Sequence, residues 1–344
     1  MLIVAGLLIL SYLTIVVNPA QAWIVTLLGL LFVPLSFVNL LLIFWALKRR
    51  SKAVFIPLLA FIPSLFFLGR YVQLDSDEVE NVTGRPLKVV SYNVGGFSLY
   101  ASKAPVTNWE QCVDSVFAFL RNQDADIICL QEFYVDDIEQ VKQYLRLNFK
   151  GYDSEYFINH SGGKGSGNVT LSRLPVKGKG VINFEESANL ALYTDHKVGD
   201  KVFRVYNCHF QSYGISFNGV VRALAERDDQ AFAETGRKIK MSIPLRSRQV
   251  EQVLDHIGSS PMEAFICGDF NDNPMSYTYY RLTRGRKDSF IEAGKGVGST
   301  FSLLWPMLRI DYVLTPDSCI GTGYEVKRIA YSDHYPVVAE ILIQ

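Results

Sequence analysis

Six short polar phrases constrain this 344-residue chain more than any other feature. They run in order from Ser91 to His334 and read SYNVGG, CLQEF, YNCHF, CGDFND, RIDYVL and SDHYP. In each phrase an Asn, Glu, His or Asp ends or interrupts an apolar run. Short apolar runs bounded by turn residues are typical of buried strands. We therefore predict a domain whose buried strands carry polar side chains at their ends, where these side chains can converge on one site.

The sequence between these phrases predicts a layered α/β domain. Strand-like runs alternate with segments of helical periodicity at Trp109–Arg121, Asp136–Leu147 and Arg246–Ile257. Such alternation favours helices packed on sheets. We expect the domain to occupy residues 85–344 and to follow a polar, acidic linker at 71–84.

Two segments of this domain resemble functional loops. Ser161–Gly167 (SGGKGSG) is rich in glycine but lacks the spacing of a phosphate-binding loop, which favours a simple turn. Ser212–Pro244 is long, partly basic and without a firm pattern. We expect it to be a loop that either overhangs the site and shapes substrate choice or is merely solvated.

The first seventy residues predict a membrane region. The runs Met1–Val17, Ala22–Leu47 and Ala53–Leu68 contain no charged residue. A bilayer core needs about 20 apolar residues per helix, so the middle run is long enough and the outer two are short. We expect about three transmembrane helices within residues 1–70. A cleaved signal peptide is the alternative for the first run.

The basic residues of this region predict its orientation. Lys48, Arg49, Arg50 and Lys52 follow the middle run, and basic loops tend to stay in the cytoplasm. With three helices, Met1 would lie inside and the domain outside. We therefore expect a multi-pass protein of the membrane, the inner membrane if bacterial, with an extracytoplasmic domain.

The charge balance bears on the partner. Five of the 34 basic residues and none of the 34 acidic residues precede Asp75, which leaves the domain 29 basic against 34 acidic side chains. Phosphate contacts from Lys and Arg carry much of the affinity for nucleic acid. The balance therefore disfavours a nucleic-acid surface, although DNA or RNA stays an alternative partner.

The five cysteines have no CxxC spacing, and three of them stand in strand-like runs. Free cysteine behaves as a small apolar residue in such places. We expect buried, reduced thiols rather than a zinc site.

The polar strand ends supply carboxylates and amides. Glu132 follows IICLQ, Asp269 follows FICG, and Asp333 precedes a buried strand. Asn93 and Asn271 add amides that can position a phosphate oxygen or a water. Oxygen donors of this kind favour Mg²⁺ or Mn²⁺ over zinc.

Two histidines complete the set. His209 ends the run FRVYNC, and His334 follows Asp333. Asp311, from RIDYVL, is a candidate partner for His334, because a carboxylate on one imidazole nitrogen leaves the other free to take a proton from water.

As an ordered set, the phrases resemble the endonuclease/exonuclease/phosphatase superfamily, and GDFN together with SDHYP is the most specific pair. This superfamily includes DNase I-like nucleases, neutral sphingomyelinases and inositol-phosphate phosphatases. The resemblance runs from about Leu87 to the C-terminus. It implies a four-layer sandwich of two packed mixed β-sheets flanked by helices.

The resemblance also implies roles for individual residues. Metal ligands would be Asn93, Glu132, Asp269 and Asp333. His209 would contact the scissile phosphate, Asn271 would hold a phosphate oxygen, and Asp311 would orient His334. Asp269 or His334 would take the proton of the attacking water. Ser172 and Arg173 would flank the site.

These roles imply metal-assisted hydrolysis of a phosphate ester. The favoured function is a membrane-anchored phosphodiesterase acting on a lipid headgroup or another small phosphoester. A membrane-anchored nuclease and a catalytically silent binding module are the alternatives. The expected partners are the phosphoester substrate and the bilayer, and the sequence indicates no protein partner.

Overall fold

The computed structural model describes residues 1–74, 85–98, 106, 108–161, 164–215 and 217–344. Most of the expected linker at 71–84 lies outside these residues. The chain forms two units. The first comprises Met1–Val72, Gln211–Glu251 and Asp272–Arg281, and the second comprises Gln73–Phe210, Gln252–Asn271 and Leu282–Gln344.

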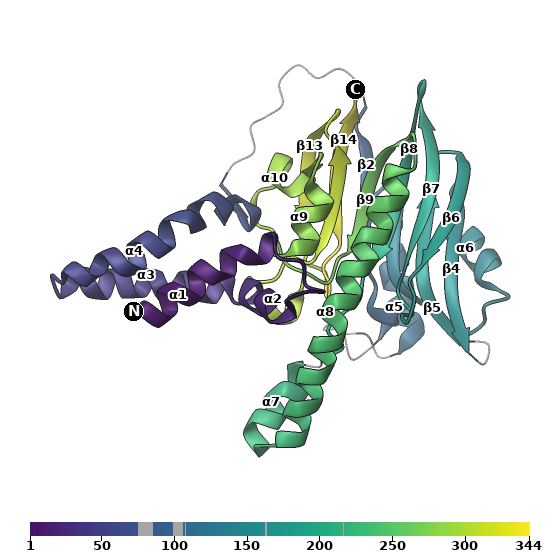
Figure 1. Cartoon of the computed structure of the whole chain (residues 1–344). Coiled ribbons are helices and arrows are strands. Elements are labelled where there is room, and N and C mark those ends of the chain that lie inside the picture. The colour runs from purple at the N-terminus through teal and green to yellow at the C-terminus, as the bar shows by residue number, and fades with distance from the viewer. Residues whose placement is uncertain (75–84, 99–105, 107, 162–163, 216) are drawn as a thin grey trace. The chain divides into compact units, whose positions relative to one another are not determined.

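Two sheets, each of six described strands, form the second unit (Figure 1). One has the order β13 (Cys319–Val326), β14 (Val337–Ile343), β2 (Leu87–Asn93), β3 (Ile127–Val135), β5 (Lys164–Ser172) and β4 (Asp153–Ser161). The other has the order β10 (Arg286–Asp288), β12 (Asp311–Pro316), β9 (Glu263–Asp269), β8 (Lys201–His209), β7 (Leu190–Val198) and β6 (Val176–Asn183). The pairs β2–β3 and β8–β9 are parallel, whereas their neighbours are antiparallel. The prediction of two mixed sheets is confirmed.

Alternation along the strands separates two apolar cores. Val89 of β2 packs between the sheets in a cluster that includes Phe203 and Phe265 of the other sheet. Its neighbour Val90 packs on the opposite face with Phe117, which belongs to α5 (Trp109–Asn122). Successive residues of a strand face opposite sides, so each buried strand can serve both cores. The helices α5 and α6 (Val141–Asn148) therefore cover the outer face of the first sheet.

All five cysteines are buried and free, as the sequence predicts. Cys129, Cys267 and Cys319 belong to the core between the sheets.

The expected loop at Ser212–Pro244 is wrong. The structure has helix α7 (Phe217–Glu226) and the long helix α8 (Asp229–Gly258), which contains Pro244. Gly236 and Pro244 weaken a helical pattern, and the segment is polar, so its periodicity is obscured in the sequence. The predicted helix Arg246–Ile257 is the C-terminal part of α8.

Parallel pairing brings the polar strand ends together. Asn93, at the end of β2, lies opposite Gln131 of β3. His209, at the end of β8, lies opposite Asp269, at the end of β9. Asp311, which begins the antiparallel strand β12, also lies opposite Asp269. The carboxyl ends of these parallel pairs therefore supply one site.

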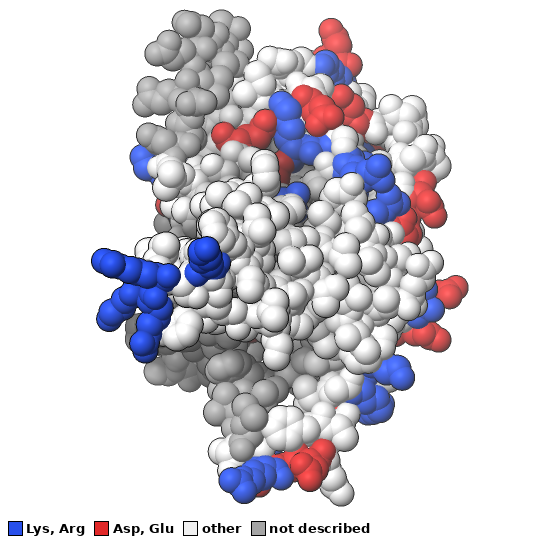
Figure 2. Space-filling view, turned by 60° about the vertical axis from the view of Figure 1, so that its left-hand side comes forward, with Lys and Arg blue, Asp and Glu red and all other residues white. Residues whose placement is uncertain are grey.

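The first unit contains α1 (Leu2–Ser11), α2 (Trp23–Leu30), α3 (Phe32–Lys48), α4 (Phe55–Phe61), its 3₁₀ extension Ile62–Arg70, and part of α9 (Tyr277–Thr283). The polar side chains of these N-terminal helices are turned inward: Ser11, Asn39 and Ser64 are buried. Large apolar side chains such as Phe66 and Phe44 are exposed instead. Figure 2 shows a broad surface without acidic or basic side chains, with a cluster of Lys and Arg at one edge. The N-terminal helices are therefore polar inside and apolar outside.

The expected three transmembrane helices are not supported. Among the described residues, only the helical segment Lys52–Arg70 is long and apolar enough to cross a membrane alone. Trp23–Leu30 and Phe32–Lys48 qualify only as a pair, and they are bent by 57°. The segment Leu2–Ile15 is too short. Pro34 lacks the N–H that would bond to Leu30, which accounts for the break between α2 and α3.

Candidate functional site

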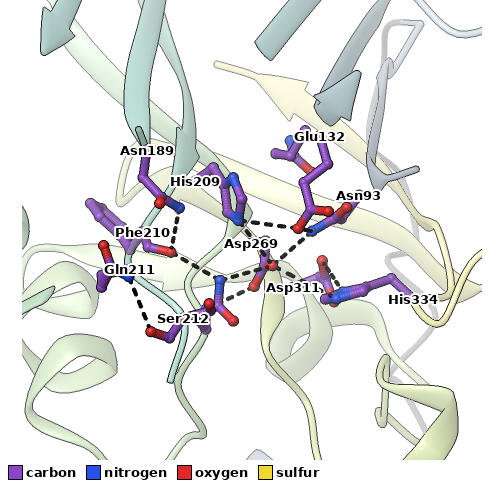
Figure 3. A network of polar contacts seen from close by, with 12 residues as sticks. Asn93, Glu132, Asn189, His209, Phe210, Gln211, Ser212, Asp269, Asp311 and His334 are labelled. Carbon is purple, nitrogen blue, oxygen red and sulfur yellow. Dashed lines mark hydrogen bonds and ion pairs between the residues drawn. The ribbon is translucent and has the colours of Figure 1, made fainter. Parts of the chain in front are cut away.

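Asn93 joins two carboxylates at the centre of the site (Figure 3). Its buried Nδ2 donates to Glu132 Oε1 and to Asp269 Oδ2, both at 2.9 Å. Its Oδ1 accepts from the backbone N–H of Gly95 at 3.0 Å. The amide is held at both ends, and it brings the ends of β3 and β9 to a fixed separation.

Glu132 reaches the site because β3 bulges at this residue. The register with β5 shifts between Leu130 and Phe133, and Glu132 has a φ of 51°. A bulge re-aims a side chain that regular alternation would place elsewhere, and bulges are frequent beside active sites. The left-handed conformation is strained for a residue with a Cβ, so the surrounding structure must hold it.

His209 presents a ring nitrogen to the same carboxylates. Its Nε2 lies 3.5 Å from Glu132 Oε1 and 3.8 Å from Asp269 Oδ2, beyond hydrogen-bonding range. This atom is buried and has no hydrogen-bond partner among the described residues. An unpaired buried nitrogen is costly, so the position suits a ligand.

His334 and Asp311 form a buried pair. Nδ1 of His334 lies 2.9 Å from Asp311 Oδ2 and 3.1 Å from Oδ1. Its Nε2 lies 3.8 Å from Asp269 Oδ2. The carboxylate of Asp311 therefore orients the imidazole and leaves Nε2 directed at the site, as the sequence predicts.

Asn271 is held beside Asp269 by its own turn. Its backbone N–H donates to Asp269 Oδ1 at 2.8 Å, and its Nδ2 donates to Phe210 O at 2.9 Å and to Asp269 Oδ2 at 3.1 Å. Asn271 has a φ of 52°, a conformation that asparagine tolerates better than most residues.

Burial and charge shift the pKa values of the acidic and basic groups. The pKa of Asp269 is raised to about 6, because burial and the charge of Asp311 together outweigh the opposing charges of His334 and His209. Burial lowers the pKa of His334, but the charges of Asp311 and Asp269 outweigh it and the net pKa lies well above the usual range. Groups perturbed in this way often mark functional sites.

The donor set fits a divalent metal ion. One atom each of Glu132, His209 and Asp269 lies within 4.8 Å of the others, and the same holds for Asp269, Asp311 and His334. Carboxylate oxygens are the donors that Mg²⁺ and Mn²⁺ prefer. Glu132 and Asp269 could hold the ion beside the unpaired Nε2 of His209.

Two predicted positions lie differently from expectation, and a third, Asp333, was expected at the metal or beside it. Asp333 is beside the site, but its carboxylate is in neither group that could hold a metal, and its Oδ1 accepts from Ser332 at 3.3 Å. Its role as a ligand stays a prediction. The expectation that Ser172 and Arg173 flank the site is wrong. Ser172 pairs with Ile127 at the start of β3, the end of the sheet opposite Glu132.

Sequence reasoning missed a buried layer of amides beneath the site. Gln131 Nε2 donates to Asn207 Oδ1 at 2.7 Å, which links the two sheets next to Glu132 and His209. Asn168 Nδ2 donates to Asn207 O at 2.9 Å. Asn189 Nδ2 donates to Phe210 O at 2.9 Å, the carbonyl that Asn271 also uses. The sequence signal that could have identified these residues is an amide side chain within an apolar, strand-like run.

Comparison with known proteins finds two family models that match the chain. Residues 90–334 match the endonuclease/exonuclease/phosphatase family, and residues 1–71 match a domain of unknown function, DUF8431. No curated protein matches the chain.

Several solved structures share the fold. The catalytic domain of human Nocturnin with bound sulfate has a TM-score of 0.54 at 16% identity, covering 76% of this chain and 97% of that one. A mannosyl-6-phosphatase from Bacteroides thetaiotaomicron has a TM-score of 0.52 at 19% identity, covering 75% and 100%. A humanized D. rerio TDP2 has a TM-score of 0.52 at 16% identity, covering 74% and 98%. At these identities the likeness extends to the fold alone.

Proposed function

Because the chain belongs to the endonuclease/exonuclease/phosphatase family, we propose that it is a membrane-anchored phosphodiesterase acting on a lipid headgroup or another small phosphoester. Members of this family hydrolyse phosphate esters and typically use a divalent metal. The observation that carries the proposal is the convergence of Asn93, Glu132, His209, Asp269, Asn271, Asp311 and His334 on one buried site.

Each residue of the site has a separate role in the proposed reaction. Glu132 and Asp269 would hold a Mg²⁺ or Mn²⁺, which would supply neutralisation of charge on the phosphoryl oxygens. The unpaired Nε2 of His209 is the donor for a phosphate oxygen. Asn271, whose Nδ2 donates to Phe210 O and Asp269 Oδ2, holds the Asp269 carboxylate in place. Asp311 holds His334 so that its Nε2 and the Asp269 carboxylate face the position of the attacking water. One of these two groups takes the proton of that water.

The test uses the full-length chain in detergent with Mg²⁺ and bis-p-nitrophenyl phosphate. We expect turnover that chelation abolishes and that His334→Ala lowers by about 10²–10⁴-fold, the range for loss of a general acid or base. Lys150→Ala, an exposed change outside the site, should leave it unchanged. Absence of turnover on every phosphoester would instead favour the silent binding module.

The surface of the N-terminal helices supports the membrane anchor. Phe66 is 84% exposed, Leu2 is 73% exposed and Ile3 is 79% exposed, which is unfavourable in water. Partly buried Tyr12 and buried Asn39 donate to backbone carbonyls within the helices, as polar groups must in lipid.

The basic turn supports an extracytoplasmic domain. Lys48, Arg49, Arg50 and Lys52 stand between the bent pair and the segment Lys52–Arg70. With one span or with two, the segment after Lys52 starts at this turn and crosses away from it. The positive-inside tendency therefore puts the domain outside the cytoplasm.

An apolar loop beside the site supports a lipid substrate. In the loop Ser302–Met307, Leu303 is 42% exposed, Trp305 is 45% exposed and Met307 is 36% exposed. The loop is tied to the catalytic segment, because the N–H of Ser302 donates to Asp333 O at 2.8 Å. Arg328 stacks on Trp305 at 4.8 Å, which places a cation beside the exposed apolar groups. An amphipathic lipid offers an apolar part for the exposed side chains and a polar part for the cation.

A substrate panel tests this choice. The full-length chain would be offered sphingomyelin, phosphoinositides, nucleotides, RNA and plasmid DNA in one detergent buffer. We expect the highest kcat/KM on a lipid phosphodiester. Dominant nicking of plasmid DNA would support the nuclease and overturn the lipid proposal.

A further inference from the structure

We propose that the N-terminal helices position the catalytic loop as well as anchoring the chain. The segment Asp272–Arg281 follows Asn271 directly, and it is packed in the same unit as residues 1–72. This inference rests on the proposed function of the site, since it gives the helices a role in the same reaction. It assigns a task to the region that matches a domain of unknown function.

Three hydrogen bonds attach the backbone or amide groups of this segment to the helices. Asn273 Nδ2 donates to Gly29 O at 2.9 Å. The hydroxyl of Thr14 donates to Met275 O at 2.6 Å, and Arg70 Nη1 donates to Pro274 O at 2.9 Å. Bonds to three consecutive residues fix the path of the segment rather than one point on it.

Apolar packing also holds this segment against the N-terminal helices. Met275 is fully buried in a cluster with Leu8, Phe32 and Ala60, which come from three different helical segments. The guanidinium of Arg70 lies 5.2 Å from the ring of Tyr279. Residues of the segment therefore form part of the core of the N-terminal region.

Gly29 permits this close approach. A Cβ on Gly29 would overlap the carbonyl oxygen of Met275 and lie 2.9 Å from Thr14 Oγ1. A Cβ on Gly6, in α1, would meet nothing within 4 Å. The two glycines provide a matched pair, since only one of them lies against the segment.

A buried arginine connects the segment Asp272–Arg281 to a second segment of the same chain, which also leaves the site. Arg246 Nε lies 3.3 Å from Asp272 Oδ2, and its Nη1 donates to Gln211 O at 2.8 Å. Gln211 follows Phe210, and Phe210 O accepts from Asn271 Nδ2. Arg246 therefore contacts both the residue that follows Asn271 and the residue that follows Phe210, within the first unit.

This arrangement explains how Asn271 keeps a strained backbone. Its φ of 52° needs support from its neighbours, and the residue after it is held by Arg246. Small displacements of a group that positions a substrate are expensive in rate. Loosening the segment should therefore lower kcat through Asn271 while leaving membrane insertion intact.

The test compares Gly29→Leu with Gly6→Leu in the full-length chain. Both add the same side chain to the N-terminal helices. With bis-p-nitrophenyl phosphate as substrate we expect Gly29→Leu to lower kcat by about tenfold or more with a smaller change in KM, and Gly6→Leu to leave both near wild type. Amide hydrogen exchange over residues 272–281 should accelerate in Gly29→Leu only. Detergent extraction from membranes should be the same for both.

A second pair covers the case in which Gly29→Leu fails to fold. Arg70→Gln removes the cation that contacts Pro274 and Tyr279, and Arg70→Lys keeps the charge. We expect lower kcat and faster exchange in Arg70→Gln, with partial recovery in Arg70→Lys. Wild-type kcat and exchange in both Gly29→Leu and Arg70→Gln would overturn the inference. If the wild-type chain turned over no phosphoester, the proposed function would fail, while the exchange data would still decide whether the helices hold the segment.

Discussion

The N-terminal helices and the two-sheet unit distribute polarity in opposite ways. The sheets bury Val89, Phe203 and Phe265 in a dry core. The helices bury Ser11 and Asn39 and leave large apolar side chains outside. Burial of apolar surface stabilises the first arrangement in water, whereas the second is the arrangement expected of helices stabilised in lipid by close packing and internal hydrogen bonds. The difference supports the proposal that the two units face different solvents and that the candidate site belongs to the sheet unit.

The largest expected effect distinguishes a residue of the candidate site from a residue on the exposed surface of the N-terminal helices. Glu132→Gln removes a charge that the metal needs, so we expect turnover to fall by about 10²–10³-fold, the scale of losing one electrostatic contact to the transition state. Phe44→Gln, on the exposed face of α3, should leave turnover of a soluble substrate unchanged. Steady-state kinetics at saturating Mg²⁺ measures both. Equal losses in the two variants would contradict the division of tasks.

The next prediction compares the loss of stability when an apolar side chain is removed from the core between the sheets and from the exposed surface of the N-terminal helices. Phe203→Ala opens a cavity between the sheets and should lower the free energy of unfolding by about 3–5 kcal/mol. Phe66→Ala removes a ring of similar size that is 84% exposed. In detergent we expect that change to cost less than about 0.5 kcal/mol. Denaturant titration of the two full-length variants makes the comparison.

A third effect follows from a buried histidine of the sheets. Burial lowers the pKa of His196 from 6.5 to about 4. The unfolded chain therefore binds a proton on this imidazole at a higher pH than the folded chain. The free energy of unfolding should fall by about 3 kcal/mol as the pH drops from 6.5 to 4, and this contribution is fully present above pH 6.5.

Thermal denaturation of the wild-type chain across that range tests the effect. His196→Gln keeps a polar group near Ser172 and Thr194 but cannot titrate. Its pH dependence should be shallower by the same amount. The same slope in both proteins would show that another group is responsible.

The smallest effect probes an apolar patch on the outside of the sheet unit. Trp305→Ala removes a half-exposed ring from the loop Ser302–Met307. Burial of that surface against lipid is worth about 1–2 kcal/mol, so we expect roughly tenfold lower kcat/KM on a lipid in mixed micelles. Turnover of bis-p-nitrophenyl phosphate should stay the same. An equal loss on both substrates would assign the loop to the structure of the site instead.

The sequence predicts residues at strand ends because local rules of alternation and turn chemistry mark where a strand stops, whereas the functional roles of these residues stay predictions. His209 and Asp269 end paired parallel strands, so pairing brings them together, whereas Asn93 ends a parallel strand of the other sheet and meets Asp269 because the two sheets pack together. Glu132 reaches the site only through a bulge, which the phrase CLQEF does not announce. The sequence included it as a carboxylate after an apolar run, and the resemblance to a family gave it the role of a metal ligand.

The failures of prediction arise from tertiary contacts. Helix α8 buries Arg246 and contains Pro244, so its pattern resembles a loop. Hydropathy counted three apolar runs, but it could not register the bend between α2 and α3. The amides Gln131 and Asn207 gain meaning only when the two sheets face each other.

The buried thiols have a consequence for the lifetime of the protein. Cys129 and Cys267 are close enough to interact inside the core between the sheets. If the domain lies in an oxidising compartment, as proposed, these thiols would stay reduced only while the core excludes oxidants. Opening of the sheets would expose them to random cross-linking, and refolding would then be blocked. The rate of unfolding, rather than the equilibrium between folded and unfolded chains, would then set the lifetime of the folded protein.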